Sequence, residues 1–316
     1  MGTQRKAALL SLAMLALIVA PAAWTLWQVK AAGRLEIASS NPTPYGYTWS
    51  LLLFLVPVAV LGSWLVRRPD LVEQRRAILR VAPFLIAQGF SLDLFFGSRF
   101  LLFNNRAATL GWDVPIVGGC VPVEEFVFYA SGFIVVLLFY VWNDEVWCAR
   151  YNEEDYSAGL ARNGHLVHFH KESFGVGLAL IALGWIYKHF VAGQEGWPSY
   201  LTFLVVIALV PSIGFFAVVR PYVNWRAVSV TVFALLLVSL LWEATLAVPY
   251  GWWGYQKRAM LGLTVDAWAF LPIEAVLVWL AVTYSTVIWY EVFKIWQASK
   301  APAAAAFLGR GGSRRP

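Results

Sequence analysis

The stretch Val121-Pro122-Val123-Glu124-Glu125-Phe126-Val127-Phe128-Tyr129 places two adjacent carboxylates at the start of an apolar run that continues to Trp142. A charged side chain at the centre of a bilayer costs about 3 kcal/mol even on insertion scales. Acidic residues that are kept within such a run therefore mark a candidate functional site.

The same pattern returns 150 residues later as Leu271-Pro272-Ile273-Glu274-Ala275-Val276-Leu277-Val278-Trp279. At this offset Asp93 corresponds to Glu243, and Tyr140 corresponds to Tyr290. A single spacing shared by acidic, aromatic and proline positions indicates a duplication. We predict two copies of one membrane unit, each of which carries a pair of buried acids.

The composition supports a membrane setting. The chain has 316 residues, of which 60% are hydrophobic and 13% are charged, whereas soluble domains are about a quarter charged. The net charge of +6 comes from basic residues that lie between apolar runs, which is the positive-inside pattern and not a nucleic-acid-binding face. Two cysteines, Cys120 and Cys148, are too few for a disulfide framework.

The apolar runs predict an all-α polytopic membrane protein with about eight transmembrane helices. Runs of about 20 residues can cross a bilayer, and they fall at roughly 7–28, 47–66, 78–97, 117–142, 174–192, 200–219, 228–250 and 267–293. One side of this topology collects 17 Lys and Arg residues and the other side 7, which predicts that both termini are cytoplasmic. We expect an integral protein of the cytoplasmic (inner) membrane.

The first run has a second interpretation. Arg5-Lys6, the apolar stretch and Ala20-Pro21-Ala22 could form a signal peptide with a small-residue cleavage site, although the run is long for such a segment. Cleavage would leave the orientation of the other seven spans unchanged.

The duplication predicts the domain organisation. Spans two to four correspond to spans six to eight, so an even number of crossings separates equivalent helices, and the two pseudo-repeats are parallel. We expect a first repeat over 1–145, a cytoplasmic linker loop over 146–173, a second repeat over 174–300 and a disordered tail over 301–316.

This topology gathers acidic side chains in the outer half of the bilayer. The candidate catalytic residues are Asp93, Glu124, Glu125, Glu243 and Glu274. A proline followed by a glutamate is also a good helix start, because the helix dipole favours an acid there. That alternative suits Glu124 or Glu274, but it does not explain Asp93 and Glu243, which are expected in the middle of helices. We favour Glu124 and Glu274 as facing the site, with Glu125 as a partner or a helix cap.

Aromatic residues surround these acids in the sequence. The expected lining residues are Trp242, Tyr250, Trp253, Trp268, Phe128 and Tyr129. A protonated carboxyl group in an apolar pocket is a proton donor, an ionised one is a base, and aromatic faces stabilise cations. Such a set could protonate an alkene and shelter a carbocation, although many of these aromatic residues would also suit an interfacial belt.

Other motifs are weak. His165, His168 and His170 lie in the linker, but their spacing alone does not give a metal geometry, and we predict no metal site. The chain has no P-loop, nucleophile elbow or dinucleotide-binding fingerprint. We therefore predict no cofactor.

At the acidic motifs the chain resembles the small integral-membrane lycopene cyclase domains, which occur as heterodimers or as fused tandem copies. Their signature is a Pro-x-Glu-Glu motif that opens a transmembrane helix. Pro122-Val123-Glu124-Glu125 matches it fully, and Pro272-Ile273-Glu274-Ala275 matches three of its four positions. The likeness covers roughly 45–145 and 195–295, and Ala275 departs from the pattern.

The resemblance implies a redox-neutral carotenoid cyclase without a flavin, acting on a lipophilic C40 substrate such as lycopene. A protonated Glu124 or Glu274 would donate to the terminal double bond of a ψ-end. The next double bond would attack the cation to close an ionone-type ring, and Asp93 or Glu243 would remove a proton. Membrane lipid, a second copy of the chain or other carotenoid enzymes are the implied partners.

Two hypotheses from other functional classes remain. Intramembrane acids in a parallel repeat also suit a proton-coupled transporter or flippase. The chain could also be a non-catalytic scaffold for carotenoid enzymes in which the acids are structural.

Overall fold

The structure, a computed structural model, describes residues 43–153 and 155–309 together with residues 9, 13 and 16. The expected first span at 7–28 and its signal-peptide alternative therefore lie almost entirely outside the described residues. In the described part, seven helical segments are long and apolar enough to cross a membrane. The chain is an all-α polytopic membrane protein, and these segments match the other seven expected spans.

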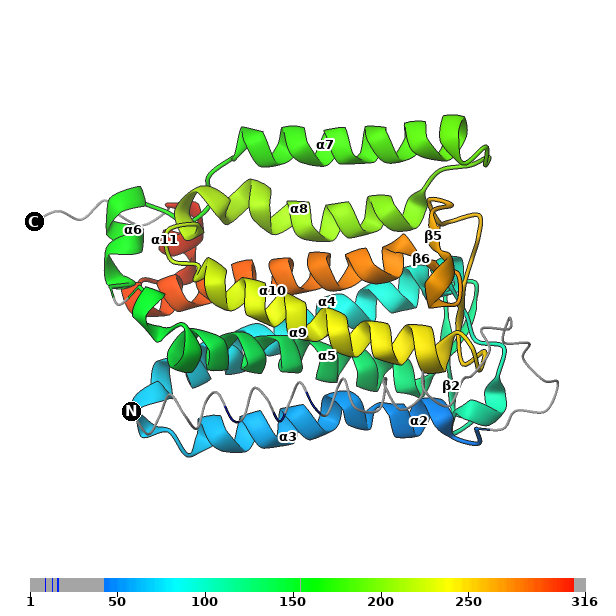
Figure 1. Cartoon of the computed structure of the whole chain (residues 1–316). Helices are drawn as coiled ribbons and strands as arrows, with labels where there is room; N and C mark the ends of the chain where they lie inside the picture. Colours follow the sequence, from blue (N-terminus) through cyan, green and yellow to red (C-terminus); the bar gives the residue numbers. More distant parts are fainter. Residues whose placement is uncertain (1–8, 10–12, 14–15, 17–42, 154, 310–316) are drawn as a thin grey trace, which may run out of the picture.

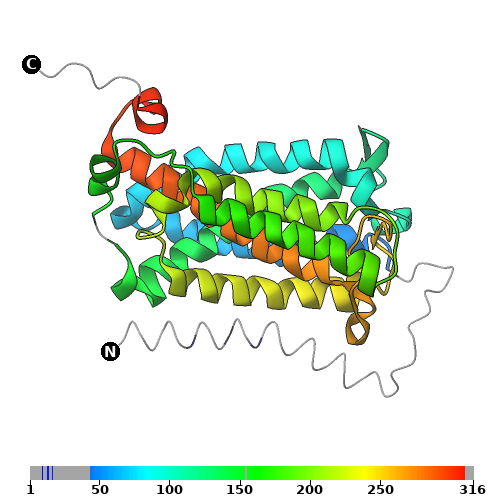
Figure 2. The ribbon, with the colours of Figure 1, turned by 90° about the horizontal axis from the view of Figure 1, so that it is seen from above.

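The spanning helices lie side by side in one bundle (Figure 1). They are α3 (Leu52–Val66, preceded by the short α2, Gly46–Ser50), α4 (Val72–Phe100), α5 (Val123–Trp142), α7 (Lys171–Ile186), α8 (Ser199–Val219), α9 (Trp225–Trp242) and α10 (Ile273–Ser299). Helices α5 and α10 are central, since 67% and 56% of the residues in their most apolar 18-residue stretches are buried. Helices α4 and α9 lie on opposite sides of the bundle when it is seen from above (Figure 2).

Helical π-turns continue three of the spans. They cover Asn143–Trp147 after α5, Tyr187–Val191 after α7 and Glu243–Ala247 after α9. A π-turn inserts an extra residue per turn and so changes the direction in which the following side chains point. The sequence pattern does not reveal these turns.

Short strands cap one end of the bundle. Strand β2 (Asp113–Ile116) pairs with β3 (Gly119–Pro122), and β5 (Thr264–Val265) pairs with β6 (Leu271–Pro272). Each hairpin leads directly into α5 or α10, so both helices start later than the runs at 117–142 and 267–293 suggest. Pro122 and Pro272 have extended backbone and form the N-cap positions of these helices.

The two repeats enter the bundle in the same direction. Helices α5 and α10 both begin at the hairpin end and run toward the end that carries α6 (Ser157–Asn163) and α11 (Ala303–Leu308) (Figure 1). A third pair of strands, β1 (Leu101–Leu102) and β4 (Gly254–Tyr255), joins the two copies. The core is continuous across both copies because α10 packs on α4, α5, α8 and α9.

Two expectations about loops differ from the structure. The linker at 146–173 is partly helical, because it contains α6 and the first turn of α7. The tail, expected to be disordered over 301–316, contains α11 within its described part. There Ala306 is fully buried, and its carbonyl oxygen accepts a hydrogen bond of 2.8 Å from the amide of Leu166.

Candidate functional site

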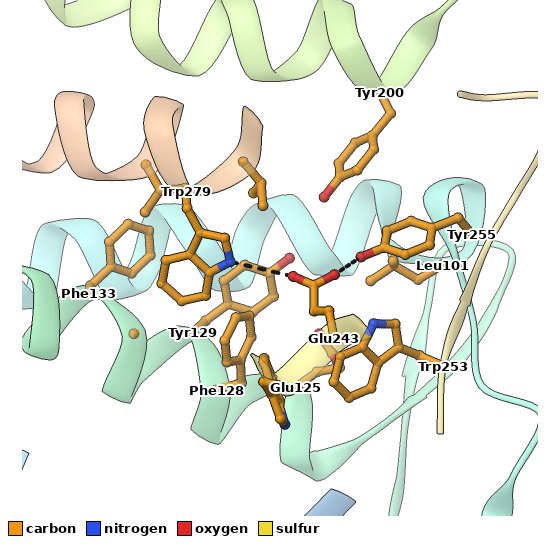
Figure 3. A pocket seen from close by; sticks show the side chains of 14 residues that line it. Leu101, Glu125, Phe128, Tyr129, Phe133, Tyr200, Glu243, Trp253, Tyr255 and Trp279 are labelled. Carbon is orange, nitrogen blue, oxygen red and sulfur yellow. Dashed lines mark hydrogen bonds between the residues drawn. The ribbon is translucent and has the colours of Figure 1, made fainter. Parts of the chain in front are cut away.

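A cavity of about 80 Å³ lies between the two copies near the hairpin end of the bundle. Two carboxyl groups line it, Glu125 from α5 and Glu243 from the π-turn after α9. The other lining residues are Leu101, Phe128, Tyr129, Gly132, Phe133, Tyr200, Trp242, Trp253, Tyr255, Val278, Trp279 and Val282 (Figure 3). Each copy of the repeat therefore contributes one acid to a single aromatic-walled space.

Glu243 accepts hydrogen bonds from three side chains. They come from the Ser239 hydroxyl at 3.0 Å, the Trp279 indole N–H at 3.5 Å and the Tyr255 hydroxyl. Figure 3 shows the carboxyl group between Trp279 and Tyr255. Burial, together with the neighbouring Glu243, raises the pKa of the Tyr255 phenol well above its usual range, so Tyr255 is a permanent donor.

Glu125 has a different environment. Among the described residues its hydrogen-bond donor is the hydroxyl of Tyr47, whose ring packs on Trp253 at 4.9 Å and Trp242 at 6.0 Å. Asp93 lies close enough to interact electrostatically with Glu125. Both Asp93 carboxyl oxygens are buried and have no hydrogen-bond partner among the described residues. The acids that line the cavity are Glu125 and Glu243, and Asp93 neighbours Glu125 without lining the cavity.

Glu124 and Glu274 do not line this cavity, which differs from the expectation that they face the site. Glu124 accepts hydrogen bonds from the amide of Leu110 at 2.7 Å and the hydroxyl of Thr48 at 2.6 Å. Glu274 accepts from the amide of Leu261. Both residues thus anchor the loop that precedes their own helix. Both residues also lie in the first turn of their helices, as the helix-start alternative expects.

Of the aromatic residues predicted to line the site, some line the cavity and others do not. Phe128, Tyr129, Trp242 and Trp253 line the cavity as expected. Tyr250 is not among its lining residues and packs on Trp252 at 6.2 Å. Trp268 is 38% exposed in the loop before α10, where a belt position is the better description.

Sequence reasoning missed two tyrosines at the site, Tyr47 and Tyr200. Tyr47 lies in α2 and is fully buried, and Tyr200 lies in the first turn of α8 and lines the cavity. Both lie at the start of a span on the same side of the membrane as the acids. That placement was readable in the sequence, but which way each side chain points was not.

An apolar groove of about 520 Å³ lies beside the cavity, between α3 and α9. Its described lining includes Phe54, Phe233, Leu237 and Val238. Phe54 also stacks on Trp279 with ring centroids 5.6 Å apart.

Phe54 separates the groove from the acid cavity. Its ring contacts Trp242 at 4.9 Å and Phe128 at 5.3 Å, and both of those residues line the cavity. Phe54 therefore packs between the groove and aromatic residues of the cavity wall.

The site can donate and accept protons next to aromatic faces. Among the described residues, no group of three or more His, Cys, Asp or Glu side chains is arranged to hold a metal ion. Comparisons of the chain with protein-family models, with curated proteins and with solved structures find no match.

Proposed function

We propose that the chain is a carotenoid cyclase of the lycopene cyclase type, with one composite active site shared by its two repeats. The observation that carries this proposal is that Glu125 and Glu243, one from each copy, face the same cavity. Phe128, Trp242 and Trp279 form part of its wall. An aromatic face stabilises a nearby cation by about 0.5–2 kcal/mol.

The proposed reaction is an isomerisation. Glu125 is the proton donor. Among the described residues its carboxyl group accepts a hydrogen bond from Tyr47, which stabilises its anionic form less than three donors would, and the carboxyl group of Asp93 lies nearby. Its proton adds to the terminal double bond of a ψ-end, and the tertiary cation is attacked by the next double bond to close a six-membered ring. Glu243 accepts the proton that leaves, since three donors stabilise its anionic form. Atoms and charge balance without a redox cofactor.

The size of the cavity restricts what can enter it. A dry cavity of about 150 Å³ holds one benzene molecule, so 80 Å³ can admit at most part of an end group unless side chains move. In this scheme the apolar groove between α3 and α9 holds the polyene chain. Phe54 turns aside to let the end group reach the acids.

Expression in lycopene-accumulating cells tests the proposal. We expect cyclic carotenoids from the natural chain and a loss of about 10²–10⁴-fold in their formation when Glu125→Gln or Glu243→Gln removes the acid or the base. Glu172→Gln is the matched control, because that side chain is 61% exposed on α7. The proposal fails if the natural chain makes no cyclic product, or if both site variants keep full activity.

A proton-coupled transporter is the second candidate. It is favoured by a further buried ionic cluster at the α6/α11 end, where Lys294 lies 3.5 Å from Asp144. Acidic residues at both ends of a bundle suit proton relay. Proton uptake into vesicles, with no cyclic pigment in lycopene-making cells, would favour this candidate. A scaffold would give neither signal.

A further inference from the structure

The ionic cluster at the α6/α11 end is connected to solvent. Lys294 Nζ donates to the hydroxyl of Tyr156 at 2.9 Å and lies 3.5 Å from Asp144 Oδ2, while only 7% of its side chain is exposed. Lys294, Tyr156 and Glu145 line an open pocket of about 940 Å³. This pocket lies at the opposite end of α10 from the carboxyl cavity.

One face of α10 links the two sites. Trp279, Thr283, Thr286, Tyr290 and Lys294 are all buried. Their spacings of four, three, four and four residues keep them within an arc of about 80° on the helix. The upper residue, Trp279, donates to Glu243, and the lower one, Lys294, belongs to the ionic cluster.

The hydroxyl groups along this face are unpaired. Thr283 Oγ1, Thr286 Oγ1 and Tyr290 OH are buried without a hydrogen-bond partner among the described residues. An unsatisfied buried polar group costs about 1–3 kcal/mol, and buried polar groups without a protein partner are usually bonded to ordered water. Three such groups in one line point to internal water molecules.

The distances suit a single file of water. Each step of three or four residues rises about 4.5–6 Å along the helix. One water with two hydrogen bonds of about 2.8 Å spans a similar distance. At the upper end the cavity already extends to Val282, and a Cβ added at Gly132 would meet nothing within 4 Å.

We propose that a file of water molecules follows this face of α10 and lets the buried carboxyl site exchange protons with the solvent-exposed pocket. Along the lower part of the file, Glu291 and Tyr140 are hydrogen-bonded to each other at 2.7 Å. Asp144, Glu145, Lys294 and Tyr156 are further charged and titratable groups there. In a cyclase, such a path would return a proton to the catalytic acid after each turnover. The water file does not itself depend on cyclase activity.

Hydroxyl-radical labelling of the full chain in nanodiscs, read by mass spectrometry, tests the water file. Radicals form from local water, so a buried residue beside internal water is modified and a dry one is not. We expect Tyr290, which is 0% exposed, to be labelled about tenfold faster than Trp142, which is 3% exposed and packed in the core. Equal protection of the two residues would overturn the proposal.

A variant pair sharpens the test. Thr283→Val combined with Thr286→Val keeps the side-chain shape but removes both hydroxyls, so the labelling of Tyr290 should fall to about the level of Trp142. Ser131→Ala is the control, because that buried hydroxyl already donates to the carbonyl of Val127 at 2.7 Å. Unchanged labelling in the double variant would also reject the file. The comparison in the natural chain stays decisive if the double variant does not fold, and it needs no turnover.

Discussion

At the scale of single residues, Glu124 and Glu125 are neighbours with different partners. Adjacent residues differ by about 100° around a helix, so one carboxyl group points to the loop and the other to the cavity. Glu124 contacts Leu110 and Thr48, whereas Glu125 contacts Tyr47. The second copy keeps Glu274 and has Ala275 in the other position, so the loop anchor occurs in both copies and Glu125 has no acidic counterpart at the equivalent position.

This difference predicts opposite outcomes for the two positions. In Glu124→Gln the amide oxygen can still accept from Leu110 and Thr48, so cyclic product should stay within about threefold of the natural chain, a change of less than 1 kcal/mol. Glu124→Ala removes the carboxyl group that accepts from the Leu110 amide and the Thr48 hydroxyl, so it should lower the free energy of unfolding by about 1–3 kcal/mol. Pigment analysis and thermal unfolding in detergent measure the two effects. A normally expressed Glu124→Gln without cyclic product would place Glu124 in the chemistry.

At the scale of elements, the sequence predicted seven of the spans and the equivalence of α5 and α10. Apolar run length and one repeated proline–acid motif are sufficient for that, because both are local. The direction of each acid could not be predicted, since it depends on the hairpins that fix the start of α5 and on the π-turn that begins at Glu243. Tyr47 was missed because its contact with Glu125 joins residues 78 positions apart.

The contact between α4 and α5 gives an element-scale prediction. A Cβ added at Gly89 would lie 2.7 Å from Phe133 Cε2 and 3.1 Å from Tyr129 Cδ1, and both of these side chains line the cavity. Gly89→Ala should therefore separate the helices, cost about 1–3 kcal/mol of stability and reduce product formation.

The matched control for this substitution is Gly62→Ala. Its added Cβ would lie at an ordinary 3.9 Å from Leu138 in the contact between α3 and α5. Thermal unfolding compares the two variants. Equal midpoints would contradict the close approach of α4 to α5.

At the scale of the whole molecule, equivalent residues of the two copies meet each other. Tyr140 and Tyr290 are separated by the repeat offset, and their ring centroids lie 5.8 Å apart. Asp144 and Lys294 have the same relation and are 3.5 Å apart. Equivalent positions can meet only near the axis that relates the copies, so the copies are joined on this axis at the α6/α11 end. At the other end the copies are joined by the pairing of β1 with β4, whose partners are separated by 154 and 152 residues and are therefore not equivalent positions.

The ion pair between Asp144 and Lys294, which lies on the axis, gives the final prediction. Asp144→Lys alone would bury two cations together, and Lys294→Asp alone would bury two acids, so each should lower stability by about 3–5 kcal/mol. The double variant exchanges the two charges between equivalent positions and should recover at least half of that loss, because opposite charges again face each other across the axis. The exposed pair Glu73 and Arg76 is the control, and its exchange should change stability by less than about 1 kcal/mol. A double-mutant cycle measured by thermal unfolding gives the coupling. If the losses at 144 and 294 simply add, the axial contact contributes nothing to the joining of the two repeats.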